Sequence, residues 1–366
     1  MKRICCIFNI GSHYRLPIYK KMEESFPIDF YLGNRINTSL KTFDYNLLNG
    51  FKNTLKRIDL FGQWFWSKGL LKLAFKPYQK YIITGEAYNL SSWFFLILLS
   101  FMKKESIAWT HGWYGKETGL RKLIKKTYFK MYTKIMCYNE YSAKLMVEQG
   151  FNSNRIFVIG NSLDSETQRD IREKLIPTNI YSDYFGNHNP VIIYCGRLQK
   201  VKQLDMLIKM LEQLNKKNIA ANLVFVGKDV DVNLDEMAYQ KGLSNQIWTY
   251  GPCYEEEKLG ELFYNATICV SPGNVGLTAI HALTYGCPVI THNDFPNQMP
   301  EFEAIIPGET GDFFKKGDID DLLNVTITWI SKTNKDLDIL RGKAYAEIDR
   351  KWNVDKQIIV LQNILR

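Results

Sequence analysis

Two basic residues, Arg197 and Lys202, stand in one loop after an apolar, strand-like run at residues 191–195. In a parallel sheet this loop lies beyond the carboxyl end of its strand, where open α/β folds bind ligands. Both cations can therefore converge on one anion, and a diphosphate carries enough charge to engage both. Charge-assisted hydrogen bonds of about 1.5 to 3 kcal/mol each would hold a nucleoside diphosphate and stabilise it as a leaving group. The alternative interpretation is two surface cations of a basic protein.

A second candidate anion site lies within residues 270–294. We predict a buried strand at residues 266–271, a Pro-Gly-Asn turn, a helix from Gly276 or Leu277 to Gly286, and a further strand at residues 288–291. The helix start offers unpaired N–H groups and a partial positive charge, so a phosphate or a sugar hydroxyl could dock there. Any strand–helix unit of a parallel sheet has a similar pattern, so a purely structural role stays open.

Three polar loops follow strand-like runs in the N-terminal half. The carboxyl ends of parallel strands meet at one sheet edge, so we expect these loops to lie together. The imidazole of His111 would stand at this edge, where it can donate or accept a hydrogen bond. Its alternative role is that of an ordinary loop histidine. The three loops are Gly11 to Arg15 after residues 2–9, Gly85-Glu86 after residues 81–84, and His111-Gly112 after residues 106–110.

The elements that must position these residues are typical of a doubly wound α/β protein. A chain of 366 residues exceeds one ordinary core, and strand, glycine loop and helix alternate through both halves. We predict domains at residues 1–175 and 190–350, a polar linker with some helix at about residues 168–190, and a C-terminal helix at residues 352–366. Further predicted strands are residues 28–32, 135–137, 155–160, 223–226 and 247–250, and further helices are residues 17–25, 116–134, 204–216 and 255–265.

Composition narrows the class of protein. Apolar residues make up 46% of the chain and charged residues 23%, which favours a folded globular protein over a disordered one. Seven cysteines without a CxxC pair or a zinc-like spacing indicate reduced, buried thiols in a cytoplasmic protein. The N-terminal apolar run is too short for a signal peptide and is expected to be the first strand. The apolar segment at residues 91–102 is shorter than the about 20 residues of a spanning helix, so we predict a buried helix.

The net charge of +9 favours an acidic partner, such as nucleic acid, an anionic membrane surface or a phosphorylated small molecule. Basic, apolar and aromatic residues are mixed in two segments, residues 51–80 and 116–134. Such a mixture is typical of a surface that lies against anionic lipid headgroups, although a solvated charged face is the alternative. Neither segment has the signature of a DNA- or RNA-binding module, so we expect no nucleic-acid partner.

Several motifs follow one another in a specific order. They are Gly196-Arg197-Leu198 with Lys202, the strand that ends at Gly227, Tyr250-Gly251-Pro252 before a Glu-rich helix start, Pro272 through Gly276-Leu277 to Gly286 and Pro288, and then Pro300-Glu301, Gly308-Glu309-Thr310-Gly311 and Gly317-Asp318. No single motif is decisive. The ordered set resembles the retaining, family 4 glycosyltransferases of the GT-B fold, also called glycosyl transferases group 1, over nearly the whole chain.

The resemblance implies two Rossmann-like domains that face a cleft, with the final helix crossing back onto the N-terminal domain. It implies catalytic roles for His111, Arg197 and Lys202, with the two cations on the diphosphate and His111 at the donor sugar. We place the acceptor side at His13, Arg15 and Glu86. The donor-binding residues would be Gly11, Tyr250, Pro252, Cys253, Gly273, Asn274, Val275, Gly276, Leu277, Thr278 and His281.

The chain departs from the family pattern at two positions. The family has two glutamates, one that meets the donor sugar and one that meets the ribose, and these positions align with Gly273 and His281. His281 can still donate or accept a hydrogen bond, whereas Gly273 offers only its backbone N–H to the sugar. Sugar recognition must therefore differ from the common pattern, and a chain that binds without transferring stays open.

No acidic pair stands where it would chelate a nucleotide-bound metal. The nearest match, Asp229-Val230-Asp231, is expected in an exposed turn. We therefore expect no cofactor and no required metal, with Arg197, Lys202 and helix N-termini neutralising the leaving group.

The sequence thus predicts a cytoplasmic glycosyltransferase, peripheral at the inner face of the cell membrane. It would move a sugar from a nucleotide-diphosphate donor to a glycan or lipid-linked glycan in cell-surface polysaccharide biosynthesis, with retention of configuration. Two alternatives stay open. One is a GT-B nucleotide-sugar epimerase, and the other is a catalytically silent partner that binds nucleotide or glycan.

Overall fold

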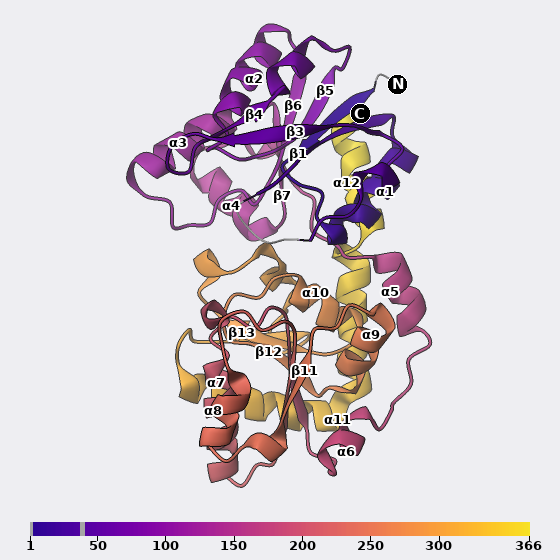
Figure 1. The fold of residues 1–366 in the computed structure, drawn as a ribbon, viewed down its shortest axis with the longest axis vertical. Coiled ribbons are helices and arrows are strands. Elements are labelled where there is room, and N and C mark those ends of the chain that lie inside the picture. Colours follow the sequence, from indigo (N-terminus) through magenta and orange to yellow (C-terminus); the bar gives the residue numbers. More distant parts are fainter. Residues whose placement is uncertain (1–2, 37–40) are drawn as a thin grey trace. The chain divides into compact units, whose positions relative to one another are not determined.

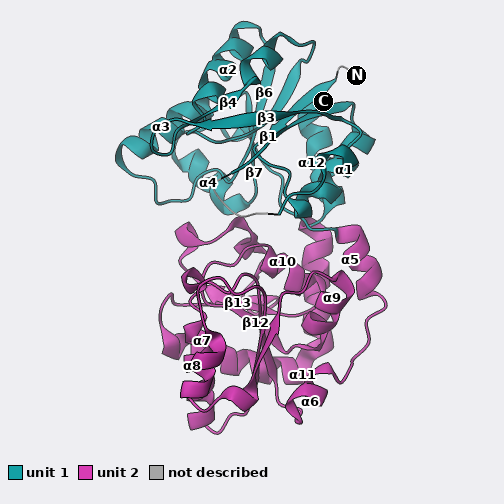
Figure 2. Cartoon of the chain, in the orientation of Figure 1, with its two compact units in different colours: residues 1–164, 353–366 teal, residues 165–352 magenta. Residues whose placement is uncertain are grey.

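The fold was analysed in a computed structural model that describes residues 3–36 and 41–366. Lys2, the expected start of the first strand, lies outside the described residues. The chain forms two compact units, which Figure 2 shows in teal and magenta. Unit 1 comprises residues 1–164 and 353–366, and unit 2 comprises residues 165–352. Each unit is described by itself.

Unit 1 is built on an eight-stranded sheet with the order β4-β3-β2-β1-β5-β6-β7-β8. The central strand β1 pairs in parallel with β2 on one side and with β5 on the other, so the strand order reverses there. Only the β3–β4 pair, at one edge, is antiparallel. The strands are β1 (Ile4–Phe8), β2 (Ile28–Gly33), β3 (Phe51–Asp59), β4 (Phe65–Lys68), β5 (Lys80–Thr84), β6 (Glu105–Thr110), β7 (Lys134–Cys137) and β8 (Ile156–Val158).

Helices cover both faces of this sheet, which explains why β1 is apolar at every position. Successive side chains of a strand point to opposite faces. Cys6 therefore joins the core under α1 and α12, whereas Cys5 joins the core under α2 and α3. Helix α12, the yellow C-terminal helix of Figure 1, packs beside α1. The helices are α1 (Leu16–Ser25), α2 (Leu90–Phe101), α3 (Gly119–Lys130), α4 (Glu140–Glu148) and α12 (Val354–Leu365).

Unit 2 contains a six-stranded parallel sheet with the order β11-β10-β9-β12-β13-β14. Its strand order reverses between β9 and β12, which pair with each other. The strands are β9 (Val191–Cys195), β10 (Asn222–Val226), β11 (Ile247–Gly251), β12 (Ile268–Ser271), β13 (Val289–His292) and β14 (Gly311–Phe314). The helices are α5 (Ser165–Arg172), α6 (Ile180–Phe185), α7 (Asp205–Lys216), α8 (Leu234–Gln240), α9 (Glu256–Asn265), α10 (Leu277–Thr284) and α11 (Ile319–Lys351).

The two parallel sheets with their helices confirm the predicted α/β class, and three details differ from expectation. Residues 168–190 contain helix, as expected, but α6 and most of α5 pack on α9, so this segment belongs to unit 2 and is not a linker. Residues 51–80, read as a basic aromatic surface, contain the strands β3 and β4. Helix α2, expected to be buried, has one exposed face with Phe94, Ile97 and Phe101, because it covers the sheet with its other face.

All seven cysteines are free thiols, and only Cys195 and Cys253 are partly exposed. No helix within residues 3–36 and 41–366 is both long and apolar enough to span a bilayer.

Candidate functional site

The predicted cation pair lies at the carboxyl end of β9, where the strand order of unit 2 reverses. Arg197 is exposed. The Lys202 Nζ atom donates to the Asn274 backbone oxygen at 2.7 Å and to its side-chain oxygen at 2.8 Å. Burial, followed by the positive charge of Arg197, lowers the pKa of Lys202 to about 8, although Glu301 opposes this shift. The charge of Arg197 thus acts on Lys202, so the two cations lie near each other at the end of β9.

Gly273 lies against the backbone of this cation turn. Its N–H donates to the Lys202 oxygen at 3.0 Å. A Cβ atom at position 273 would meet the Lys202 Cα at 2.7 Å, which is closer than real Cβ contacts. Neither glutamate nor any other side chain fits here unless one of the two loops moves. The N–H expected to serve the sugar is also already engaged.

The loop from Asn274 to Thr278 leads into α10, as predicted. Gly276 is the N-cap residue and provides no side-chain cap to the helix. The first N–H groups of an α-helix lack partners within the helix, so those of Leu277 and Thr278 can serve an anion. The Val275 N–H is unsuitable, because it donates to Gln298 Oε1 at 2.7 Å. The Thr278 hydroxyl donates to the Cys195 oxygen at 2.9 Å and so fixes α10 beside the end of β9.

His281 is paired with a carboxylate that sequence reasoning missed. Its Nε2 atom lies 2.7 Å from Glu256 Oε1, at the start of α9. Burial would raise the pKa of Glu256, but the hydrogen bond and charge of His281 and the bonds from Tyr285 and Gln168 lower it to about 2. An ionised carboxylate only accepts, so Nε2 carries the proton.

The three predicted residues at the end of β11 are not equally close to this site. Cys253 lies near Cys195, because burial and then the neighbouring Cys253 thiol raise the pKa of Cys195. Both cysteines are partly buried. Pro252 is exposed. The ring of Tyr250 packs on Trp248, with centroids 5.1 Å apart, and Trp248 in turn stacks on Tyr184. Tyr250 therefore belongs to an aromatic cluster on α6, and no contact in the described residues brings it to Arg197 or Lys202.

In unit 1, a pocket of about 280 Å³ lies at the carboxyl ends of β1, β5 and β6. The strand order reverses between β1 and β5, so this is the place where a doubly wound sheet binds ligands. Three predicted residues, Arg15, Glu86 and His111, line it. The other walls include Asn9, Ser12, Tyr14, Thr84, Trp109 and Tyr138.

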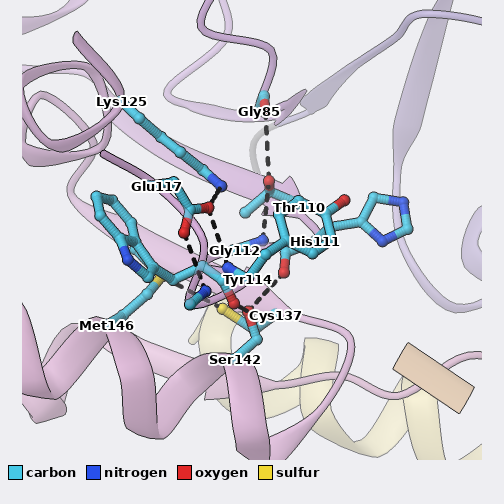
Figure 3. A network of polar contacts seen from close by, with 12 residues as sticks. Gly85, Thr110, His111, Gly112, Tyr114, Glu117, Lys125, Cys137, Ser142 and Met146 are labelled. Carbon is cyan, nitrogen blue, oxygen red and sulfur yellow. Dashed lines mark hydrogen bonds and ion pairs between the residues drawn. The ribbon is translucent and has the colours of Figure 1, made fainter. Parts of the chain in front are cut away.

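The loop that carries His111 is fixed by a polar network, shown in Figure 3. Ser142 Oγ donates to the backbone oxygens of His111 and Trp113. Glu117 accepts from the backbone N–H groups of Tyr114 and Gly115, each at 3.0 Å, and forms an ion pair with Lys125. The His111 ring points away from this network (Figure 3).

Gly112 allows the loop to turn in this way. It has a φ of 65°, in the left-handed region that favours glycine. A Cβ there would also collide with Ser142 Oγ and with Cys137 Sγ at 2.8 Å. Burial, then the charges of Arg15 and Lys125, lowers the pKa of His111 to about 4. His111 is therefore a neutral imidazole at physiological pH, suited to hydrogen bonding rather than to carrying charge.

The remaining predicted residues of unit 1 differ in their suitability. Gly11 is buried, and its N–H donates to the Tyr45 hydroxyl at 3.2 Å. This N–H is therefore not available to the nucleotide sugar. His13 is exposed on the surface and does not line the pocket. Glu86 accepts from Asn9 Nδ2 at 2.7 Å. Burial raises the pKa of Glu86, while Asn9 and Arg57 oppose the shift.

The acidic segment at residues 229–231 has a structural contact. Asp231 Oδ1 accepts from the backbone N–H of Lys200 at 2.8 Å, which ties this segment to the cation turn. In the part of the chain that the structure describes, no group of three or more His, Cys, Asp or Glu residues is placed to hold a metal ion.

Two parallel sheets, each with a polar site where its strand order reverses, define the fold of GT-B glycosyltransferases. Solved structures of that fold match nearly the whole chain. They include the lipopolysaccharide outer core galactosyltransferase WaaB (TM-score 0.72, 15% identity, 99% of each chain). HepE of Anabaena in complex with UDP matches with a TM-score of 0.71, 16% identity and coverage of 100% and 98%. Sucrose-phosphate synthase of Thermosynechococcus elongatus matches with a TM-score of 0.65, 15% identity and coverage of 100% and 98%.

The family comparison concerns the sequence of unit 2. Residues 183–345 match the family described as glycosyl transferases group 1. A comparison with curated protein sequences finds no match. The identities to the solved structures are low, so those likenesses concern the fold.

The Glu256–His281 pair gives a prediction for stability. The pKa of Glu256 is about 2 in the folded chain, below the about 4.3 of an unfolded glutamate. Its contribution is therefore complete above about pH 5 and is lost as the pH falls through about 4 towards 2. We expect Glu256→Gln to lower the free energy of unfolding by about 1 to 3 kcal/mol at neutral pH. Denaturant unfolding at several pH values measures this.

The difference in the free energy of unfolding between wild type and Glu256→Gln should decrease as the pH falls, because the wild type loses the contribution that the variant lacks. Glu257→Gln, at the exposed neighbouring position, is the control and should change little. A constant difference between about pH 6 and about pH 3 would show that Glu256 is not held ionised by His281.

Proposed function

We propose that this protein is a glycosyltransferase that uses a nucleotide-diphosphate sugar as donor. Its acceptor would be a hydroxyl group of a glycan or a lipid-linked glycan, in the biosynthesis of a cell-surface polysaccharide. The observation that carries the proposal is the Arg197–Lys202 pair at the point where the strand order of unit 2 reverses. A diphosphate is the ligand that two adjacent cations and the start of α10 would jointly hold.

The pair is suited to the chemical step. In the proposed reaction the bond between the anomeric carbon and the diphosphate oxygen breaks, and the acceptor oxygen forms the new glycosidic bond. The proton of the acceptor hydroxyl passes to the leaving phosphate. With both events on one face of the sugar the configuration is retained. Arg197 and Lys202 would stabilise the negative charge that develops on the diphosphate, and His111 would hydrogen-bond a hydroxyl of the sugar as a neutral imidazole.

Two comparisons support the proposal. The matched family consists of glycosyl transferases. HepE, which shares the fold, has been solved in complex with UDP and with UDP-glucose. The replaced motif glutamates are compatible with transfer, because the Glu256–His281 pair places polar groups where the resemblance has the second glutamate.

Removing either cation should abolish turnover and weaken nucleotide binding together. For Arg197→Ala and Lys202→Ala we expect binding of UDP to weaken about ten-fold or more, as for the loss of one charge-assisted hydrogen bond. Calorimetry with UDP and a product assay measure the two effects. The control is Lys200→Ala, which changes an exposed lysine of the same turn. It should retain both turnover and UDP binding. Unchanged turnover in both test variants would contradict the proposal.

The same pair predicts a pH dependence. Because the pKa of Lys202 is about 8 in the free protein, binding of UDP should weaken as the pH rises through that value. Lys202→Arg should remove this dependence, since arginine stays charged.

A divalent metal should be dispensable, because two cations already neutralise the leaving group. We expect turnover in excess EDTA to remain within about two-fold of the value with added Mg²⁺. Complete loss of turnover in EDTA, with recovery on adding Mg²⁺, would show that the donor needs a metal. The folded state in EDTA is checked by the melting temperature.

We also propose that unit 1 binds the inner face of the cell membrane. An apolar surface is formed by Phe75 together with the outer face of α2, and we call it the aromatic face. Its exposed fractions reach 69% at Phe75 and 83% at Phe101. Trp66 of β4 contacts Phe94 with ring centroids 6.0 Å apart, so β4 continues the surface. Exposed lysines of the same segments suit anionic headgroups; they are Lys68, Lys72, Lys76 and Lys103.

Phe75→Ser combined with Phe101→Ser should reduce binding to vesicles that contain anionic lipid. Two aromatic side chains would no longer enter the interface, so we expect at least an about ten-fold loss of affinity in a sedimentation assay. Ile339→Ser, which changes an exposed apolar residue of unit 2, is the control. The proposal fails if the wild-type protein does not sediment with anionic vesicles at low salt.

A further inference from the structure

The pocket of unit 1 contains a buried cation without an acidic partner. Arg15 is only 8% exposed, and arginine does not lose its proton in proteins. No Asp or Glu among the described residues forms an ion pair with it, and the residues outside the description contain neither amino acid. A buried charge normally has a counter-charge, because transferring it out of water is costly.

Aromatic rings partly replace that counter-charge. The Arg15 guanidinium lies 4.9 Å from the ring centroid of Tyr138, 5.4 Å from that of Trp109 and 5.6 Å from that of Tyr14. It also donates to the Tyr138 hydroxyl. Such contacts orient the guanidinium, yet they use few of its five N–H donors. The rings therefore hold the cation at the pocket wall and leave it able to bind an anion.

Two other polar atoms of this pocket wall are buried without a partner. Trp109 is 3% exposed, and its Nε1–H, which can only donate, has no acceptor in the described residues. The Nδ1 atom of His111 is likewise buried and unpaired in this part of the chain. The His111 ring lies beside Tyr138, with centroids 4.8 Å apart. Arg15, Trp109 and His111 thus gather around Tyr138, and two of these three groups are obligate donors.

Another part of the pocket lining is formed by an amide and a carboxyl group. Asn9 donates a hydrogen bond to Glu86, and both residues line the pocket. An amide and a carboxyl group are suited to the hydroxyls of a sugar rather than to an anion. The pocket volume of about 280 Å³ is close to the lower limit of small-molecule sites. This suits a ligand as small as one monosaccharide unit. One wall therefore matches an anion and the other matches hydroxyl groups.

We propose that this pocket binds an acidic sugar of the acceptor, with Arg15 and the Trp109 Nε1–H on its carboxylate or phosphate. The inference rests on the proposed function, because it names the class of acceptor for that transferase. The same chemistry could come from the diphosphate of the donor. The experiment therefore has to separate an acidic acceptor sugar from a nucleoside diphosphate.

Binding to the full chain is measured by calorimetry without nucleotide, with glucuronate and glucose 6-phosphate as acidic probes and glucose as the neutral one. We expect at least one acidic probe to bind at least about ten-fold more tightly than glucose. Arg15→Gln should remove that preference. Trp109→Phe keeps an aromatic side chain and removes the N–H together with the five-membered ring, so it should weaken binding of the acidic probe by about three-fold or more while the fold persists. Lys20→Gln, an exposed lysine of α1, is the matched control.

The donor arm uses UDP with the same variants. UDP binding should depend on Arg197 and Lys202 and stay within about two-fold in Arg15→Gln and Trp109→Phe. If these two variants weaken UDP and no acidic probe is preferred, the anion comes from the donor and the proposal is wrong. Equal binding of all three probes also overturns it. If acidic probes bind through Arg15 but UDP does not bind at all, the pocket stands and the proposed transferase fails.

Discussion

Unit 2 depends on one close contact across its reversed strand order. The N–H of Gly273 donates to the Lys202 oxygen, and the Lys202 ammonium returns to the backbone and side chain of Asn274. These reciprocal bonds join the loop after β9 to the loop after β12, and only glycine leaves enough space at position 273. The same contact orients the cation next to Arg197 and excludes the family glutamate. The proposed binding of an anion and the proposed change in sugar recognition would thus have one physical cause.

The second departure from the family pattern, at His281, involves a carboxylate from another helix. His281 replaces a carboxylate, and the carboxylate of Glu256 lies against it from α9. Three donors converge on one oxygen of Glu256, which keeps the group ionised and fixes the proton of His281 on Nε2. The pair therefore keeps a carboxylate next to position 281, although it belongs to Glu256 of α9.

The sequence predicts most of the fold, because buried parallel strands such as β1 and β9 are short, wholly apolar runs followed by glycine loops. It does not predict β3, whose side chains are mostly exposed and partly charged at the sheet edge. The cation pair is predictable because both residues lie in one loop. Glu256 is not, because it lies 25 positions from His281 and meets it only through the packing of α9 on α10. The Arg15–Tyr138 contact, over 123 positions, escapes sequence reasoning for the same reason.

The two sites differ in how completely their polar groups are paired. In unit 2, Lys202 and His281 have internal partners, so a ligand must compete with or add to existing hydrogen bonds. In unit 1, the indole N–H of Trp109 and a ring nitrogen of His111 are buried without partners. A buried polar group without a hydrogen-bond partner lowers the free energy of unfolding. A ligand that hydrogen-bonds to these groups gains this free energy on binding, whereas an analogue without the matching group does not. In the proposed transferase, the pocket of unit 1 would therefore be the stronger determinant of which substrate is selected.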